Sequence, residues 1–184
     1  MAGCRALTKH EVLKILNHLK NPRDRALFTL GIKSGFRISE LLSLKIQDVM
    51  QFNEIVDRVR VRAMYMKGKD ATRDVPLSLD ARNAVRALID SMPDKTGYLF
   101  KSRQGDAITR GQAHNVLKDA FNALKLNGKL ATHSMRKTFA ENVHKALGAD
   151  IYKTAKAMGH KSIDSTAKYI AVDQTEIDKA ILSI

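Results

Sequence analysis

The chain has little cysteine and no long apolar run. Its single cysteine, Cys4, cannot form a disulfide within the chain, and such usage is typical of the reducing cytosol. No apolar stretch approaches the roughly 20 residues that a membrane-spanning helix needs. The first residues also lack the charged-then-apolar pattern of a signal peptide. These absences predict a cytoplasmic protein without a membrane segment.

Residues with the spacing of metal ligands are missing as well. No cluster of carboxylates, or of histidine and cysteine, has the spacing that metal coordination requires. We therefore expect no metal ion, and no other cofactor is implied. Any positive charge needed at a reaction centre would come from the side chains of arginine, lysine or histidine.

Positive charge is what the sequence has in excess. Its 32 Lys and Arg residues outnumber its 19 Asp and Glu residues, which gives a net charge of +13. The basic residues are spread along the chain, so they favour a folded basic surface over a disordered arm. A polyanion is the natural partner, because each phosphate neutralised by Lys or Arg releases condensed counterions. Charge alone would also fit a basic scaffold, such as a ribosomal or chromatin component.

Helical patterns occupy most of the 184 residues, a length that suits one domain with a proper core. Capping boxes at Thr8–Glu11 and Thr109–Gln112 each precede a run with helical apolar spacing. Another helix is predicted to begin at Asn21–Pro22 and to end at Gly35. Further helices are expected around Arg37–Leu44, Ala81–Ile89, Ala140–Leu147, Asp150–Met158 and Ser165–Tyr169.

The β-structure is predicted between these helices. From Ile55 to Met66 the pattern has a period of two, which is typical of a strand with one basic face. Apolar residues at 59, 61, 63 and 65 alternate with Arg58, Arg60, Arg62 and Met64. Lys67–Asp70 supplies a turn, and residues 73–77 return as a short partner strand, with Pro76 indicating an edge. Gly97–Phe100 is a candidate for another short strand. The expected fold class is mostly α with a small antiparallel β-sheet, an α+β architecture.

Two basic motifs could hold a phosphate group. In Gly35–Leu42 (GFRISELL), Arg37 offers a guanidinium that matches two non-bridging oxygens and stays charged at any relevant pH. Glu40 lies three residues on, hence on the same helical face, where it could orient Arg37. His133 and Arg136 share another face at the same spacing and could point at one phosphate. Arg136 would be the second clamp, and His133, with an ordinary pKa of about 6.5, could donate or accept a proton near neutrality.

His160 and Tyr169 complete the set of candidate residues. His160 follows Gly159 at a helix end and turn, and Tyr169 comes further along the same segment. A phenol has an ordinary pKa of about 10, so it is a poor nucleophile until clustered cations stabilise the phenolate. If this phenolate attacked a phosphodiester, the resulting phosphotyrosine ester would store the energy of the broken bond. The broken strand could then be rejoined without ATP. The alternative is a half-buried tyrosine with a polar tip, which is the structural role assigned to Tyr65, Tyr98 and Tyr152.

Breaking a phosphodiester also requires a proton donor for the oxygen that leaves the phosphorus. Lys67 and Lys69 both lie in the predicted turn, where a flexible hairpin could hold an ammonium above the phosphate. We prefer Lys67 as the donor and keep Lys69 as the alternative. Two arginines, two histidines, a lysine and a phenol are together what breaking a phosphodiester without a metal would require.

These five separated motifs, in this order, resemble the tyrosine recombinases, also called phage integrases, from about Leu7 to the C-terminus. The resemblance implies a tyrosine recombinase catalytic-domain fold. It also implies site-specific cleavage and rejoining of DNA strands through a 3′-phosphotyrosyl intermediate. Tyr169 would be the nucleophile, His160 would donate a hydrogen bond to the phosphate, and Lys67 would match the family's lysine. Small departures from the family's pattern occur in the length of the hairpin turn and at Phe36, Ser134–Met135 and Met158.

The resemblance also implies how the chain is organised and what it binds. Larger family members carry an N-terminal DNA-gripping domain, so we expect residues 1–184 to be a single catalytic domain without that core-binding domain. The amphipathic tail, residues 171–184, is expected to pass to a neighbouring protomer. Double-stranded DNA is the expected partner, bound by a homo-oligomer in a tetrameric synapse, with a monomer free in solution. The source would be bacterial or phage, and the protein would be associated with the nucleoid.

Two other functions remain open on the sequence. A type IB topoisomerase uses similar chemistry but relaxes supercoils by swivelling, so plasmid relaxation by a monomer would favour it. A catalytically inactive, basic DNA-binding module would be unaffected by Tyr169→Phe.

Overall fold

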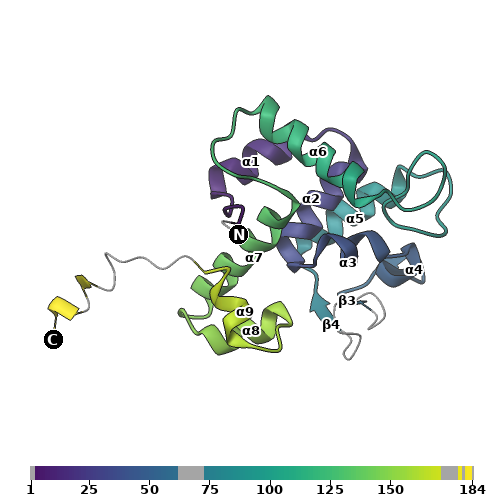
Figure 1. Cartoon of the computed structure of the whole chain (residues 1–184). Helices are drawn as coiled ribbons and strands as arrows, with labels where there is room; N and C mark the ends of the chain where they lie inside the picture. Colours follow the sequence, from purple (N-terminus) through teal and green to yellow (C-terminus); the bar gives the residue numbers. More distant parts are fainter. Residues whose placement is uncertain (1–2, 62–72, 171–177, 180, 184) are drawn as a thin grey trace. The chain divides into compact units, whose positions relative to one another are not determined.

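A computed structural model of the chain describes residues 3–61, 73–170, 178–179 and 181–183. The chain divides into two compact units, residues 1–139 and residues 140–184, and each is described by itself (Figure 1). Lys67, Lys69 and most of the tail lie outside the described residues. Within the described part of the chain, no helix is both long and apolar enough to cross a membrane.

Helices α1 (Lys9–His18), α2 (Pro22–Ser34), α5 (Leu79–Asp90) and α6 (Arg110–Ala123) gather around the core of the first unit (Figure 1). Helix α2 is central, since it contacts α1, α5 and α6. Every residue from Ala26 to Ile32 is buried. This middle part of α2 is covered on all sides, and its residues are mostly apolar, as such a position requires.

The predicted ends of these helices are confirmed. Thr8 and Glu11 exchange reciprocal hydrogen bonds at the start of α1, and Thr109–Gln112 forms the same motif at α6. Asn21 caps α2, and Gly35 ends it with a φ of 61°. Local side-chain chemistry therefore sets where these helices begin and end.

The segment between α2 and α5 holds short elements: α3 (Ile38–Ser43), α4 (Ile46–Val49), β1 (Met50–Gln51), β2 (Glu54–Ile55), β3 (Arg58–Val61) and β4 (Arg73–Pro76). Strand β1 pairs antiparallel with β2, and β3 with β4, so the described residues contain two small sheets. Val59 and Val61 are buried while Arg58 and Arg60 are exposed, as the alternation predicted. The fold class, mostly α with small antiparallel sheets, is confirmed.

The single strand predicted from Ile55 onward is wrong at its start. Ile55 belongs to β2, in a separate hairpin with β1 that precedes β3. Phe52 and Asn53 make its turn, with φ values of 50° and 62°. Asparagine adopts this left-handed conformation readily but phenylalanine rarely does, so the usual glycine signal of a hairpin turn is missing. Tyr98, predicted in a short strand, forms an isolated bridge with Lys45.

The later helices are α7 (Thr132–Ala146), α8 (Ile151–Met158) and α9 (Ile163–Ala167). In the second unit, α8 packs against α9. Asp150 caps α8 and Gly159 ends it with a φ of 64°, as predicted. Ser162 caps α9, so this helix begins before the predicted Ser165 and ends before Tyr169. Tyr169 therefore follows the helix instead of belonging to it.

We expect Gly35→Ala to destabilise the first unit by about 2–4 kcal/mol, because left-handed backbone strain and overlap with a ring add together. Gly35 has a φ of 61°, and a Cβ added there would lie 2.2 Å from Cδ1 of Phe139. Urea denaturation measures the change. Gly148→Ala is the matched control, since Gly148 has a φ of 65° but no described atom lies within 4 Å of its added Cβ. That variant should lose about 1–2 kcal/mol, and equal losses in the two variants would contradict the overlap with Phe139.

Candidate active site

Arg37 and Glu40 are joined at the start of α3. Arg37 caps the helix, and Glu40 lies in its first turn. One carboxylate oxygen of Glu40 accepts a hydrogen bond from the backbone N of Arg37 at 2.8 Å, and the other accepts from Arg37 Nη1 at 2.7 Å. The Glu40 side chain is fully buried, while that of Arg37 keeps 27% of its surface exposed. Glu40 therefore holds the backbone and the side chain of Arg37, and part of the guanidinium stays accessible to an anion.

Arg136 lies near the start of α7 and contacts the chain turn that precedes α3. Its side chain is buried, and Nη1 donates to the backbone oxygen of Gly35. Gly35 ends α2 two residues before Arg37, so three of the sequence-predicted residues gather around one turn: Arg37, Glu40 and Arg136.

Arg73, which the sequence did not single out, belongs to the same group. Its guanidinium donates to the backbone oxygens of Ser34 and Gly35 at 2.9 and 3.2 Å, and lies 3.9 Å from Glu40 Oε2. A signal for it existed in β4, where the alternation puts Arg73 on the buried face with Val75. An arginine on an apolar face is retained only with partners, because burying an unpaired charge is very costly.

The arginine cluster, meaning Arg37, Arg73, Arg136 and Glu40, is cationic because it contains three guanidinium groups and one carboxylate. The pKa of Arg73 is lowered to about 10, first by burial and then by the charge of Arg136, an effect that Glu40 partly opposes. Arg73 still carries its charge at neutral pH. Within the described residues, no group of three His, Cys, Asp or Glu side chains is arranged to hold a metal ion. The positive charge that this turn offers to an anion is that of arginine.

His133 lies one turn before Arg136 on α7, and the residue is exposed. Its pKa is lowered below the ordinary 6.5, first because the surrounding protein weakens the hydration of the ring, and then because Arg136, Lys137 and Arg37 are cationic. The exposed surface argues for a modest effect of burial, but the three cations act in the same direction. The ring is therefore neutral at pH 7 and can accept a proton.

We expect His133 to make the fold less stable as the pH drops below about 6.5. The unfolded chain takes up this proton near pH 6.5, whereas the folded chain takes it up only at lower pH, so acid favours unfolding. In urea denaturation at about pH 7.5 and about pH 5.5, His133→Gln should lose less stability on acidification than the wild type. His10→Gln, at an exposed position of α1, is the control. Wild-type pH dependence in His133→Gln would rule out the lowered pKa.

In the second unit, His160 and Tyr169 form a ring pair. Their ring centroids are 5.3 Å apart and the ring planes are inclined by 43°. Nδ1 of His160 lies 2.8 Å from Oγ1 of the buried Thr166, and the backbone N of Tyr169 donates to the Thr166 carbonyl at 2.8 Å. Thr166 thus holds both residues, a role for which no spacing rule gave a signal.

The remaining predicted residues have different outcomes. Lys67 and Lys69, the candidate proton donors, lie outside the described residues. Tyr98 is half-buried, with the ammonium of Lys45 at 5.7 Å from its ring centroid. Tyr152 is 72% exposed, so its predicted half-buried role is wrong. The described site residues form two groups, the arginine cluster with His133 in the first unit and the His160–Tyr169 pair in the second.

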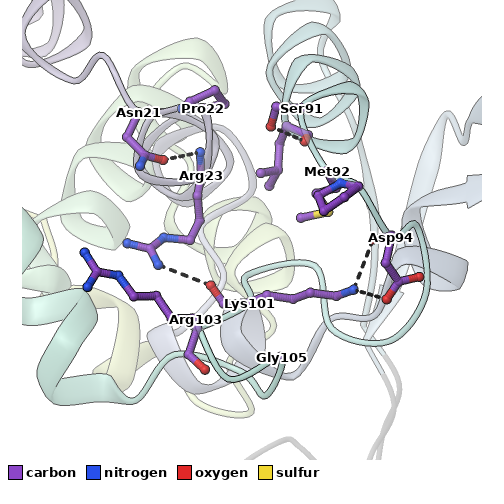
Figure 2. A pocket seen from close by; sticks show the side chains of 12 residues that line it. Asn21, Pro22, Arg23, Ser91, Met92, Asp94, Lys101, Arg103 and Gly105 are labelled. Carbon is purple, nitrogen blue, oxygen red and sulfur yellow. Dashed lines mark hydrogen bonds and ion pairs between the residues drawn. The ribbon is translucent and has the colours of Figure 1, made fainter.

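A pocket of about 540 Å³ opens beside the start of α2 (Figure 2). Arg23, Lys101 and Arg103 line it, and the described residues predicted for the site do not. Arg23 pairs with Asp24 at 2.8 Å and Lys101 with Asp94 at 2.7 Å. Because two of these three cations already have a carboxylate partner, the pocket is a weaker candidate for holding a phosphate than the arginine cluster.

Comparison with known proteins shows the family. The sequence matches the phage integrase family over residues 5–176. It is 31% identical over 171 residues to "Probable integrase/recombinase YoeC" of Bacillus subtilis (strain 168), across 92% of this chain and 89% of that protein. It is 32% identical over 154 residues to tyrosine recombinase XerC of Rhodospirillum centenum, across 82% of this chain and 43% of that protein. The chain belongs to the phage integrase family, the tyrosine recombinases, as the order of its motifs predicted.

Solved structures share the fold. XerA recombinase superposes with a TM-score of 0.80 at 22% identity, over 99% of this chain and 64% of that one. XerH site-specific recombinase, in a post-cleavage complex with a palindromic difH substrate, gives a TM-score of 0.77 at 22% identity, over 96% and 51% of the two chains. The fold is that of a tyrosine recombinase catalytic domain. The chain spans nearly the whole Bacillus protein but about half the length of the XerC and XerH relatives.

Proposed function

We propose that this chain acts as the catalytic domain of a site-specific DNA recombinase, cleaving and rejoining strands through a 3′-phosphotyrosyl intermediate. The observation that carries the proposal is the arginine cluster, in which the buried carboxylate of Glu40 pairs with the guanidinium groups of Arg37 and Arg73, and Arg37 stays partly exposed. Guanidinium groups fixed in this way can hold the non-bridging oxygens of a phosphate and stabilise the charge of a pentacoordinate transition state. Family membership supports the same reading.

In the first step, the phenol oxygen of Tyr169 attacks phosphorus, and the bond to the 5′ oxygen breaks. Arg37 and Arg136 hold the phosphate oxygens, and His160 donates a further hydrogen bond. The Thr166 contact on Nδ1 of His160 supports this assignment, because it fixes the orientation of the imidazole.

Proton movement completes the step. His133, neutral at pH 7 because its pKa is lowered, accepts the proton of the phenol. Lys67, or Lys69 as the alternative, gives a proton to the leaving 5′ oxygen. A 5′ hydroxyl from a second duplex then attacks the phosphotyrosine and restores both the phosphodiester and the phenol.

Double-stranded DNA is the proposed partner. The net charge of +13 supports it, and so do solved relatives in complex with DNA, among them XerH with difH and the Tn1549 transposon integrase with circular intermediate DNA. We further propose a homo-oligomer, a tetrameric synapse, that forms on DNA from monomers and exchanges the tail 171–184. Its place would be the bacterial cytoplasm, at the nucleoid.

A library of nicked duplexes with randomised sites tests the proposal. After cleavage beside the nick, the short fragment that carries the leaving 5′ hydroxyl diffuses away, so the strand cannot be rejoined. Protein-linked DNA then accumulates and is detected on a denaturing gel. We expect such an adduct. Duplex binding without any adduct would favour an inactive DNA-binding module, and relaxation of a supercoiled plasmid by the monomer would favour a type IB topoisomerase.

A further inference from the structure

Arg73 is a charged residue in a position built for an apolar one. It begins β4 on the buried face, opposite Val61 in the strand register and on the same face as Val75. Only 6% of its surface is exposed. Moving a guanidinium from water into such a position is unfavourable unless specific partners compensate it. The identity of those partners therefore indicates what the residue is for.

The first partners of Arg73 lie at the end of α2. Nη2 donates to the Ser34 carbonyl at 2.9 Å and Nη1 to the Gly35 carbonyl at 3.2 Å. Carbonyls at this end of a helix lack internal partners and carry the negative end of its dipole, so a cation is favoured there. The guanidinium also lies over the Phe36 ring, 5.2 Å from its centroid. One side chain thus contacts three successive residues, and the next residue is Arg37.

The same guanidinium reaches the groups that hold the two phosphate clamps. Glu40 Oε2, which accepts the backbone N–H of Arg37, lies 3.9 Å from Arg73 Nη1. The Gly35 carbonyl accepts from Arg136 as well as from Arg73. Arg73 is therefore linked to Arg37 through Glu40 and to Arg136 through Gly35. Both terminal nitrogens of Arg73 donate to backbone carbonyls, so its side chain acts on the turn and on Glu40.

We propose that Arg73 is a positioning residue, which fixes the Ser34–Gly35 turn and Glu40 and thereby orients Arg37 and Arg136 toward the scissile phosphate. The inference rests on the proposed function, because it is the proposed function that assigns the clamps to that phosphate. The planar fork of arginine is needed here. A lysine has one compact ammonium, which cannot donate to two neighbouring carbonyls while lying flat on the Phe36 ring.

The test compares Arg73→Met and Arg73→Lys with the wild type in the full chain, on a nicked duplex selected from the library. At saturating DNA, adduct formation should slow about 100-fold in Arg73→Met and about 10-fold in Arg73→Lys, because small displacements of positioned groups have effects of this size. Affinity for the duplex should change less than about 3-fold. Arg86→Met is the matched control, since Arg86 also donates to a turn carbonyl, that of Asn53 at 2.8 Å. It should keep the wild-type rate.

A double-mutant cycle separates positioning from a general structural effect. If Arg73 acts through Arg37, adding Arg73→Met to Arg37→Ala should slow adduct formation by much less than about 100-fold. Losses that multiply, or a wild-type rate in Arg73→Lys, would overturn the proposal.

Amide hydrogen exchange at Arg37 tests the positioning without any cleavage. This N–H is donated to Glu40 Oε2, so it should exchange at least about 10-fold faster in Arg73→Met, and at the wild-type rate in Arg86→Met. Unchanged exchange would overturn the proposal even in a chain that forms no adduct. Absence of an adduct in the wild type would instead refute the proposed function. If Arg73→Met fails to fold, Arg73→Lys is measured in the same assays and decides the question.

Discussion

Tyr169→Phe is expected to lower the rate of adduct formation by at least about 1,000-fold, because it removes the only atom that would bond to phosphorus. The substitution keeps the ring, which packs 5.3 Å from the ring of His160. It also keeps the backbone hydrogen bond to Thr166. Folding and duplex binding should therefore stay close to those of the wild type, so that the loss falls on chemistry alone.

Protein-linked DNA on a denaturing gel measures this effect, and peptide mapping of the wild-type adduct identifies the modified residue. Tyr152→Phe is the matched control, since Tyr152 lies in the same unit and is 72% exposed. It should form the adduct at the wild-type rate. A normal yield from Tyr169→Phe, or DNA attached at another position, would remove Tyr169 from the mechanism.

Glu40→Gln is expected to lower the free energy of unfolding by about 3–5 kcal/mol and to remove most of the cleavage activity. The side chain is fully buried, accepts two hydrogen bonds from Arg37, and lies 3.9 Å from Arg73. Glutamine keeps the shape but loses the charge that compensates these cations, and its NH₂ group turns a donor toward another donor. Urea denaturation and the rate of adduct formation measure the two effects.

Glu54→Gln serves as the comparison for Glu40→Gln. Glu54 pairs with Arg86 at 2.9 Å, but its side chain is 83% exposed. A surface pair of this kind contributes at most about 1 kcal/mol, so Glu54→Gln should be nearly neutral. A loss in Glu40→Gln no larger than that in Glu54→Gln would mean that the carboxylate does not hold the cluster together.

The ends of the helices could be predicted from the residues because capping is local. Thr8, Asn21, Thr109 and Asp150 each bond to a backbone group two or three positions away, so the signal lies within a few residues of sequence. The alternation in β3 was equally readable, since a period of two reports which face is buried. Arg37, Glu40 and Arg136 were singled out by residue type and spacing together with the resemblance of their motifs to the tyrosine recombinases.

Some features could not be predicted, either because they depend on tertiary contacts or because a residue type that is rare at such a position occupies it. The turn at Phe52–Asn53 was missed because phenylalanine occupies a left-handed position. The start of α9 was misplaced because Ser162 was overlooked as its cap. Arg73 was missed because its partners include backbone carbonyls some forty positions away, and no side-chain pattern marks a carbonyl as an acceptor.

The shared carbonyl at Gly35 makes the length of α2 a constraint of its own. Each residue inserted into or deleted from a helix turns everything beyond it by about 100° and shifts it by about 1.5 Å along the axis. A single such change in α2 would swing the acceptor of both Arg73 and Arg136 away from them, although every arginine remained in place. During evolution this helix should therefore tolerate substitution of its exposed residues better than the insertion or deletion of a residue.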